Sequence, residues 1–125
     1  MRDIIFRGKK VSNNEWAYGC LVNNIYGASK PIIITDSDYD DNNRVNFDWD
    51  FVIPQTVGQF TGFLDVNGKK IFEGDIVVST SVNRLSNKPH IVSFENSYIY
   101  AMPERKPQVV GNIYDNPELV EEKEK

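Results

Sequence analysis

The stretch Asp65–Val77, DVNGKKIFEGDIV, holds two turn signals within a short span, and these signals decide the expected fold. Asn67-Gly68 favours a type I′ turn, because both central residues of that turn need positive φ, and the flanking residues can then pair as a hairpin. Glu73-Gly74 supplies a second bend. The apolar run that follows is expected to be a buried strand. The stretch therefore predicts short antiparallel strands joined by tight turns.

Short apolar runs between turn signals continue on both sides of this stretch. Trp16–Val22 alternates bulky and small residues, Lys30–Thr35 is a β-branched run behind a proline, and His90–Met102 divides into two alternating halves. No segment carries a long 3.6-residue apolar repeat, although Asn116–Leu119 is typical of the capped first turn of a helix. The expected fold is mainly β, a small barrel or compact sandwich of short antiparallel strands with at most a short C-terminal helix.

Length and charge indicate the number of domains and whether nucleic acid is an expected partner. A chain of 125 residues suits one hydrophobic core, so a single domain is expected over residues 1–119, with residues 120–125 as a charged and frayed tail. The formal net charge is -4, which offers no basic footprint for nucleic-acid phosphates. Binding to nucleic acid is therefore disfavoured, although a local basic patch stays possible.

The cysteine count bears on compartment and cofactor. Cys20 is the single cysteine, so neither an internal disulfide nor a multi-thiolate metal site can form within one chain. A single cysteine fits a reducing cytosol. The predicted role of Cys20 is that of a small buried hydrophobic residue. The N-terminus lacks an apolar stretch of signal-peptide length. We expect a soluble protein of the cytoplasm, away from membranes and without a cofactor.

The aspartate-rich segment Asp36–Asp50 predicts an exposed loop, because its first half has no apolar periodicity. Its first aspartates alternate as calcium ligands do in an EF-hand. The match fails further on, since Asp41 stands where a glycine is needed and Phe47 stands where a bidentate glutamate belongs. A solvated acidic loop is the preferred interpretation, and weak cation binding is the alternative.

Phe47, Trp49 and Phe51 alternate with Asp48 and Asp50, which places the three aromatic rings on one face of an extended segment. The simplest prediction is that the rings belong to the core. The alternative is an interface patch, because aromatic residues are favoured in contacts between proteins or subunits.

Two further groups of side chains are candidates for function. Basic and aromatic residues near the N-terminus form the one cluster that could contact single-stranded nucleic acid: Arg7, Lys9, Lys10, Trp16 and Tyr18. Three carboxylates sit at turns that could bring them together as a hydrolytic or metal site: Asp65, Glu73 and Asp75. The preferred role of these carboxylates is to accept hydrogen bonds from backbone amides at the turns.

Four motifs together resemble the YopX family, small proteins encoded by phages and prophages of mainly Gram-positive bacteria. They are the opening IIFRGK, the WAYG element at Trp16–Gly19, the block TVGQFTGFLDVNGKKIFEGDIV at Thr56–Val77, and GNIYDNPEL at Gly111–Leu119. Their order and spacing cover most of the chain. The segments Ile25–Phe51 and Ser81–Pro89 depart from the pattern.

The resemblance implies a mainly β fold, a phage-related origin and activity inside the bacterial cell. It implies no reaction, because no catalytic residues are established for the family. Three functions follow as hypotheses: a non-enzymatic accessory protein that acts through a protein partner or self-association, a single-stranded nucleic-acid-binding module, or a carboxylate- or metal-dependent hydrolase. The first is preferred.

Overall fold

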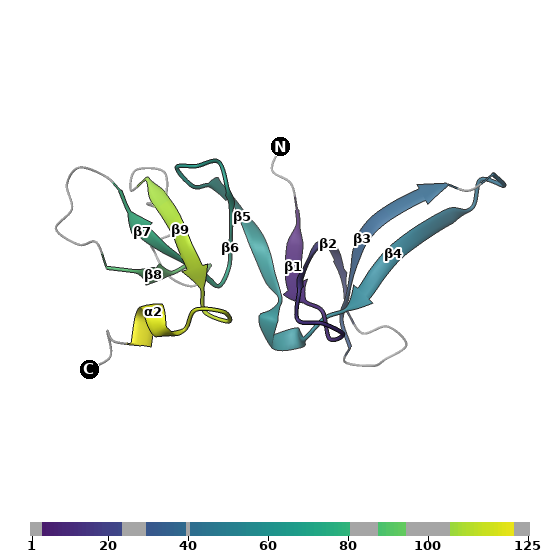
Figure 1. Cartoon of the computed structure of the whole chain (residues 1–125). Coiled ribbons are helices and arrows are strands. Elements are labelled where there is room, and N and C mark those ends of the chain that lie inside the picture. Colours follow the sequence, from purple (N-terminus) through teal and green to yellow (C-terminus); the bar gives the residue numbers. More distant parts are fainter. Residues whose placement is uncertain (1–3, 24–29, 40, 81–87, 95–105, 122–125) are drawn as a thin grey trace. The chain divides into compact units, whose positions relative to one another are not determined.

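The computed structural model describes residues 4–23, 30–39, 41–80, 88–94 and 106–121 (Figure 1). The elements in chain order are β1 (Phe6–Lys9), β2 (Trp16–Val22), β3 (Ile32–Tyr39), β4 (Val45–Phe51), η2 (Pro54–Thr56), β5 (Gly58–Leu64), β6 (Lys70–Phe72), β7 (Asp75–Ser79), β8 (His90–Ile91), β9 (Pro107–Asn112) and α2 (Glu118–Glu121).

All strand pairs of the described residues are antiparallel, and they form two sheets. The six-stranded sheet has the order β4-β3-β2-β1-β5-β6, and the three-stranded sheet has the order β8-β7-β9. This confirms the predicted mainly β fold with a short C-terminal helix, and the sheets are not closed into a barrel. The contacts divide the chain into two compact units, of which one ends at Gln59 and the other begins at Phe60. The single domain over residues 1–119 stays a prediction.

The first unit packs around the inner face of β1, β2 and β3. Ala17, Ile33 and Val52 form a cluster of buried apolar residues, and Phe6, Leu21 and Val57 pack against them. Backbone hydrogen bonds hold the end of β4 against the end of β1: the Val11 amide donates to the Phe51 carbonyl at 2.9 Å, and the Ile53 amide donates to the Lys9 carbonyl at 2.8 Å.

The expected acidic loop at Asp36–Asp50 is wrong, because β3 continues to Tyr39 and β4 starts at Val45 (Figure 1). The partner strand explains this. Asp36 pairs with Asp48 and Ser37 pairs with Phe47, so a segment of low strand propensity is held by a strand of high propensity. The turn is confined to a few residues, and Asn43 adopts a φ of 62° there, a conformation that asparagine tolerates.

The second unit contains the stretch Asp65–Val77. One cluster of its core consists of Ile71, Val77 and Val92, with Phe63 and Val109 packed against them. Other buried apolar residues of this unit are Phe60, Phe72 and Ile76. The predicted hairpin between β5 and β6 is confirmed.

The type I′ turn predicted for that hairpin is wrong. The Gly68 amide donates to the Asp65 carbonyl, the Asp65 amide donates to the Lys69 carbonyl, and φ is positive at Gly68 (84°) but not at Asn67. This is the three-residue hairpin loop with glycine at the left-handed position. Gly74 has a φ of 89°, as its predicted role in the second bend requires.

Polar side chains also organise the C-terminal motif GNIYDNPEL. The Asn112 side-chain oxygen accepts hydrogen bonds from the Tyr114 and Asp115 amides, and the Asn116 side-chain oxygen accepts one from the Asn112 amide at 3.2 Å. The predicted helix turn is present as α2, but the Asn116 side chain reaches back toward the end of β9.

Several expected features lie outside the described residues: most of the loop Ser81–Pro89, the second half of the hairpin His90–Met102, and most of the tail. Within the described ranges, no helix is long and apolar enough to cross a membrane.

Candidate functional site: the aromatic face of β4

The aromatic residues of β4 are exposed, so the prediction that they belong to the core is wrong. Phe47 is 54% exposed, Trp49 is 49% exposed and Phe51 is 44% exposed, and Val45 on the same strand is similarly open. β4 is the terminal strand of the sheet, so the neighbouring β3 covers only one of its edges. The alternation of the sequence was interpreted correctly, but no side chain of this strand is buried.

The register shows which side chains share the aromatic face. Trp49 lies opposite Ile34 and Phe51 lies opposite Ile32, and directly opposed residues of an antiparallel pair point to the same side. The rings of Trp49 and Phe51 meet edge to face, with centroids 5.2 Å apart. Such a pair orders the two rings and leaves a preformed apolar surface. We call Phe47, Trp49 and Phe51 the aromatic face.

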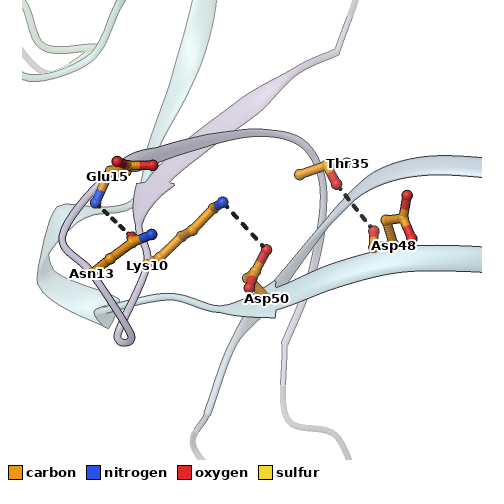
Figure 2. A network of polar contacts seen from close by, with 6 residues as sticks. All are labelled: Lys10, Asn13, Glu15, Thr35, Asp48 and Asp50. Atoms are coloured by element: carbon orange, nitrogen blue, oxygen red, sulfur yellow. Dashed lines mark hydrogen bonds and ion pairs between the residues drawn. The ribbon is translucent and has the colours of Figure 1, made fainter.

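The opposite side of β4 is acidic. Asp50 pairs with Lys10, with 3.7 Å between the ammonium nitrogen and the carboxylate oxygen (Figure 2). The Thr35 hydroxyl donates to the backbone carbonyl of Asp48 at 3.2 Å, which ties the bulge in β3 to β4 (Figure 2). Asp36 lies directly opposite Asp48, and like charges in that position destabilise a sheet.

A pocket of about 550 Å³ opens beside the end of the aromatic face. Trp49, Phe51, Val52, Val11 and Pro54 give it apolar walls, and Ser12, Lys30 and Asp50 add polar groups. The bridge between Lys10 and Val52 brings these segments together. Sequence reasoning missed the contributions of Val11, Lys30 and Pro54, because no local pattern indicates that the end of β1 pairs with the end of β4.

The structure brings together part of the proposed basic and aromatic cluster. The Arg7 guanidinium lies 4.4 Å from the centre of the Trp16 ring, and the Lys9 ammonium lies 5.3 Å from it. Arg7 is only 4% exposed, whereas Tyr18 is open to solvent. Lys10 is directed to Asp50 instead. The Arg7 and Lys9 cations thus already lie over the Trp16 ring, and these cation–π contacts stabilise the sheet.

Two of the three carboxylates at the turns, Asp65 and Asp75, accept hydrogen bonds from backbone amides. Asp65 accepts three, from Asn67 at 2.8 Å, Lys69 at 2.9 Å and Val109 at 3.0 Å, and it is 7% exposed. Burial raises the pKa of the Asp65 carboxyl, but the hydrogen bonds from Val109, Lys69 and Asn67 and the Lys69 charge outweigh it, so the pKa falls below its ordinary value.

Asp75, which is also buried, accepts a hydrogen bond from the Phe72 amide at 2.8 Å. Across the described residues, no group of three or more histidine, cysteine or acidic side chains is placed to hold a metal ion. The geometry of Asp65 and Asp75 supports a structural role, and a site built on Asp65, Glu73 and Asp75 stays a hypothesis.

Cys20 is exposed, so its predicted burial is wrong. The register places it opposite Ile34, on the same side of the sheet as Trp49 and away from the core residue Ala17. The strand period was correct, but the sequence offers no signal for which face of β2 is covered.

The described residues define a mainly β protein with two antiparallel sheets. The family model described as YopX protein matches residues 5–121, so the chain belongs to the YopX family. The crystal structure of protein EF1440 from Enterococcus faecalis is similar in fold, with a TM-score of 0.67 and 21% sequence identity over 97% of this chain and 100% of that chain. No curated protein matches the chain.

Proposed function

We propose that this protein is a non-enzymatic phage or prophage accessory protein that acts inside the bacterial host cell as a small β interaction module. Phe47, Trp49 and Phe51 make its contact with a protein partner. The observation that carries the proposal is the exposure of all three rings on one strand. Clustered apolar surface of this kind marks contact sites, and aromatic residues contribute most of the binding energy at interfaces.

Two further observations support this surface. The edge-to-face contact between Trp49 and Phe51 orders the rings before binding, which lowers the entropy lost on association. The adjoining pocket can accept an apolar side chain of the partner. The phage context rests on family membership, and the absence of an assigned reaction rests on the lack of a catalytic motif in the sequence.

Site-specific photocrosslinking tests the proposal. A photoreactive phenylalanine analogue in place of Phe47 is expected to give a discrete crosslinked protein in host cells, and Trp49→Ala in the same chain is expected to remove most of it. Leu64 is a matched control position, because it is 55% exposed and lies in the other unit. Light scattering on the purified chain then decides whether the product contains a second copy. Equal crosslinking from both positions, or none from position 47, would contradict the proposal.

A further inference from the structure

β4 has an edge that no described strand covers along most of its length. It ends the six-stranded sheet, and the bridge that the described residues form on its other side, between Lys10 and Val52, lies just beyond its last residue. An uncovered edge presents backbone donors and acceptors in register for another strand. β4 also lacks the lysine and proline residues that commonly block such pairing.

The backbone groups at this edge belong to the aromatic residues. The Phe51 carbonyl accepts a hydrogen bond from Val11, which lies on the side of β4 away from β3. The Asp48 carbonyl points the other way, since Thr35 of β3 donates to it. Because these directions alternate along a strand, the amide and carbonyl groups of Phe47 and Trp49 face the open edge.

The charges of the hairpin indicate what would pair there. Asp36 and Asp48 lie opposite each other, and a residue of an added strand next to Asp48 would share their face. A lysine or arginine at that position would relieve the repulsion between the two carboxylates. The residues before and after it would point to the other side, where Phe47 and Trp49 present apolar surface.

We propose that the open edge of β4 binds an extended segment of a partner protein as an added strand. The segment carries a basic residue opposite Asp48 and apolar residues opposite Phe47 and Trp49. This inference rests on the proposed function and specifies the partner that the aromatic face recognises. Main-chain hydrogen bonds provide affinity in this mode of binding, and the alternating side chains provide specificity.

A second copy of β4 fits this edge poorly. The strand VNFDWDF carries two aspartates and no cation, so pairing with its own copy would add carboxylates to a face that already holds Asp36 and Asp48. The added strand can pair with β4 only as far as Phe51, because Val11 already occupies the edge there. The adjoining pocket lies at this point, so an apolar residue at the end of the added segment would enter it.

A synthetic peptide in which valine and lysine alternate is the probe for this mode of binding. We expect it to bind the full chain and to protect the amides of Phe47 and Trp49 from hydrogen exchange. Trp49→Ala is expected to abolish binding. Asp48→Lys is expected to weaken it by at least about tenfold and to create binding of the matching valine–glutamate peptide.

Two controls separate strand addition from general attraction. The same peptide with every backbone amide N-methylated keeps its charges but cannot donate main-chain hydrogen bonds from either edge, so it should not bind. Glu118→Lys makes the same change in net charge on an exposed residue of the other unit and should leave binding unchanged.

The possible results each decide the inference. Equal binding of the N-methylated peptide, an equal effect of Glu118→Lys, or no binding of the valine–lysine peptide would overturn strand addition. If crosslinking from position 47 persists in any of these cases, the interaction surface stands and only this mode of binding fails. Protection of the Phe47 and Trp49 amides in a purified dimer without peptide would assign the edge to a second copy and also overturn the inference.

Discussion

Gly19→Ala is expected to lower the free energy of unfolding by about 3 kcal/mol, because the new methyl group has no space. A Cβ at Gly19 would overlap the backbone carbonyl oxygen of Ile34, and φ at this residue is 157°. The obstacle is the backbone of β3, so no side-chain movement can relieve it. β2 and β3 would have to separate at the centre of the first unit. Urea denaturation of the two proteins measures the loss.

Gly68→Ala is the matched control for this effect. Gly68 also has a positive φ, of 84°, but nothing lies within 4 Å of the added Cβ. Its cost should therefore be the backbone penalty alone, about 1–2 kcal/mol. If Gly19→Ala costs no more than Gly68→Ala, the close approach to Ile34 does not determine the need for glycine in the WAYG element.

Asp65→Asn is expected to lower the free energy of unfolding by about 2–4 kcal/mol at neutral pH. One carboxylate oxygen accepts from the Asn67 and Lys69 amides, and the other accepts from the Val109 amide. An asparagine has one acceptor oxygen, so its NH₂ group would face a backbone donor within a buried site. The link between the β5–β6 turn and β9 would then be lost.

The pH dependence provides a second test of Asp65. The pKa of this carboxyl is lower in the folded chain than its ordinary value of 3.8, so its contribution to stability is present above that pH. The contribution is lost as the pH falls through the folded-state pKa. The difference between the native chain and Asp65→Asn should therefore be larger at pH 7 than at strongly acidic pH. Asp41→Asn, at an exposed residue, is the control and should change stability little. A difference independent of pH would contradict the assigned charge.

Local signals were sufficient to predict the hairpins and the fold class. Gly68 and Gly74 mark bends whatever surrounds them, because glycine can adopt positive φ without steric cost. The exact turn depended on more than the dipeptide. Hydrogen bonds from Asn67 and Lys69 to the Asp65 side chain accompany the three-residue loop in place of the type I′ turn.

The remaining features depend on contacts between distant segments. β3 extends through Asp36 because β4 pairs with it, which the composition of β3 alone does not indicate. The exposure of Phe47 and Trp49 depends on the position of β4 at the end of the sheet, and strand order cannot be read from alternation. The pocket depends on the bridge between Lys10 and Val52. The candidate site is one of these features. The sequence could therefore suggest its residues, but it could not predict that they are exposed.

The most direct test of whether the β4 rings serve contact or core is a pair of phenylalanine truncations measured by urea denaturation. Phe47→Ala removes a ring that is 54% exposed, and Phe72→Ala removes one that is 3% exposed. We predict a loss of about 1 kcal/mol or less for Phe47→Ala and about 3–5 kcal/mol for Phe72→Ala. Equal losses would place Phe47 in the core and contradict the account of β4 as an interaction surface.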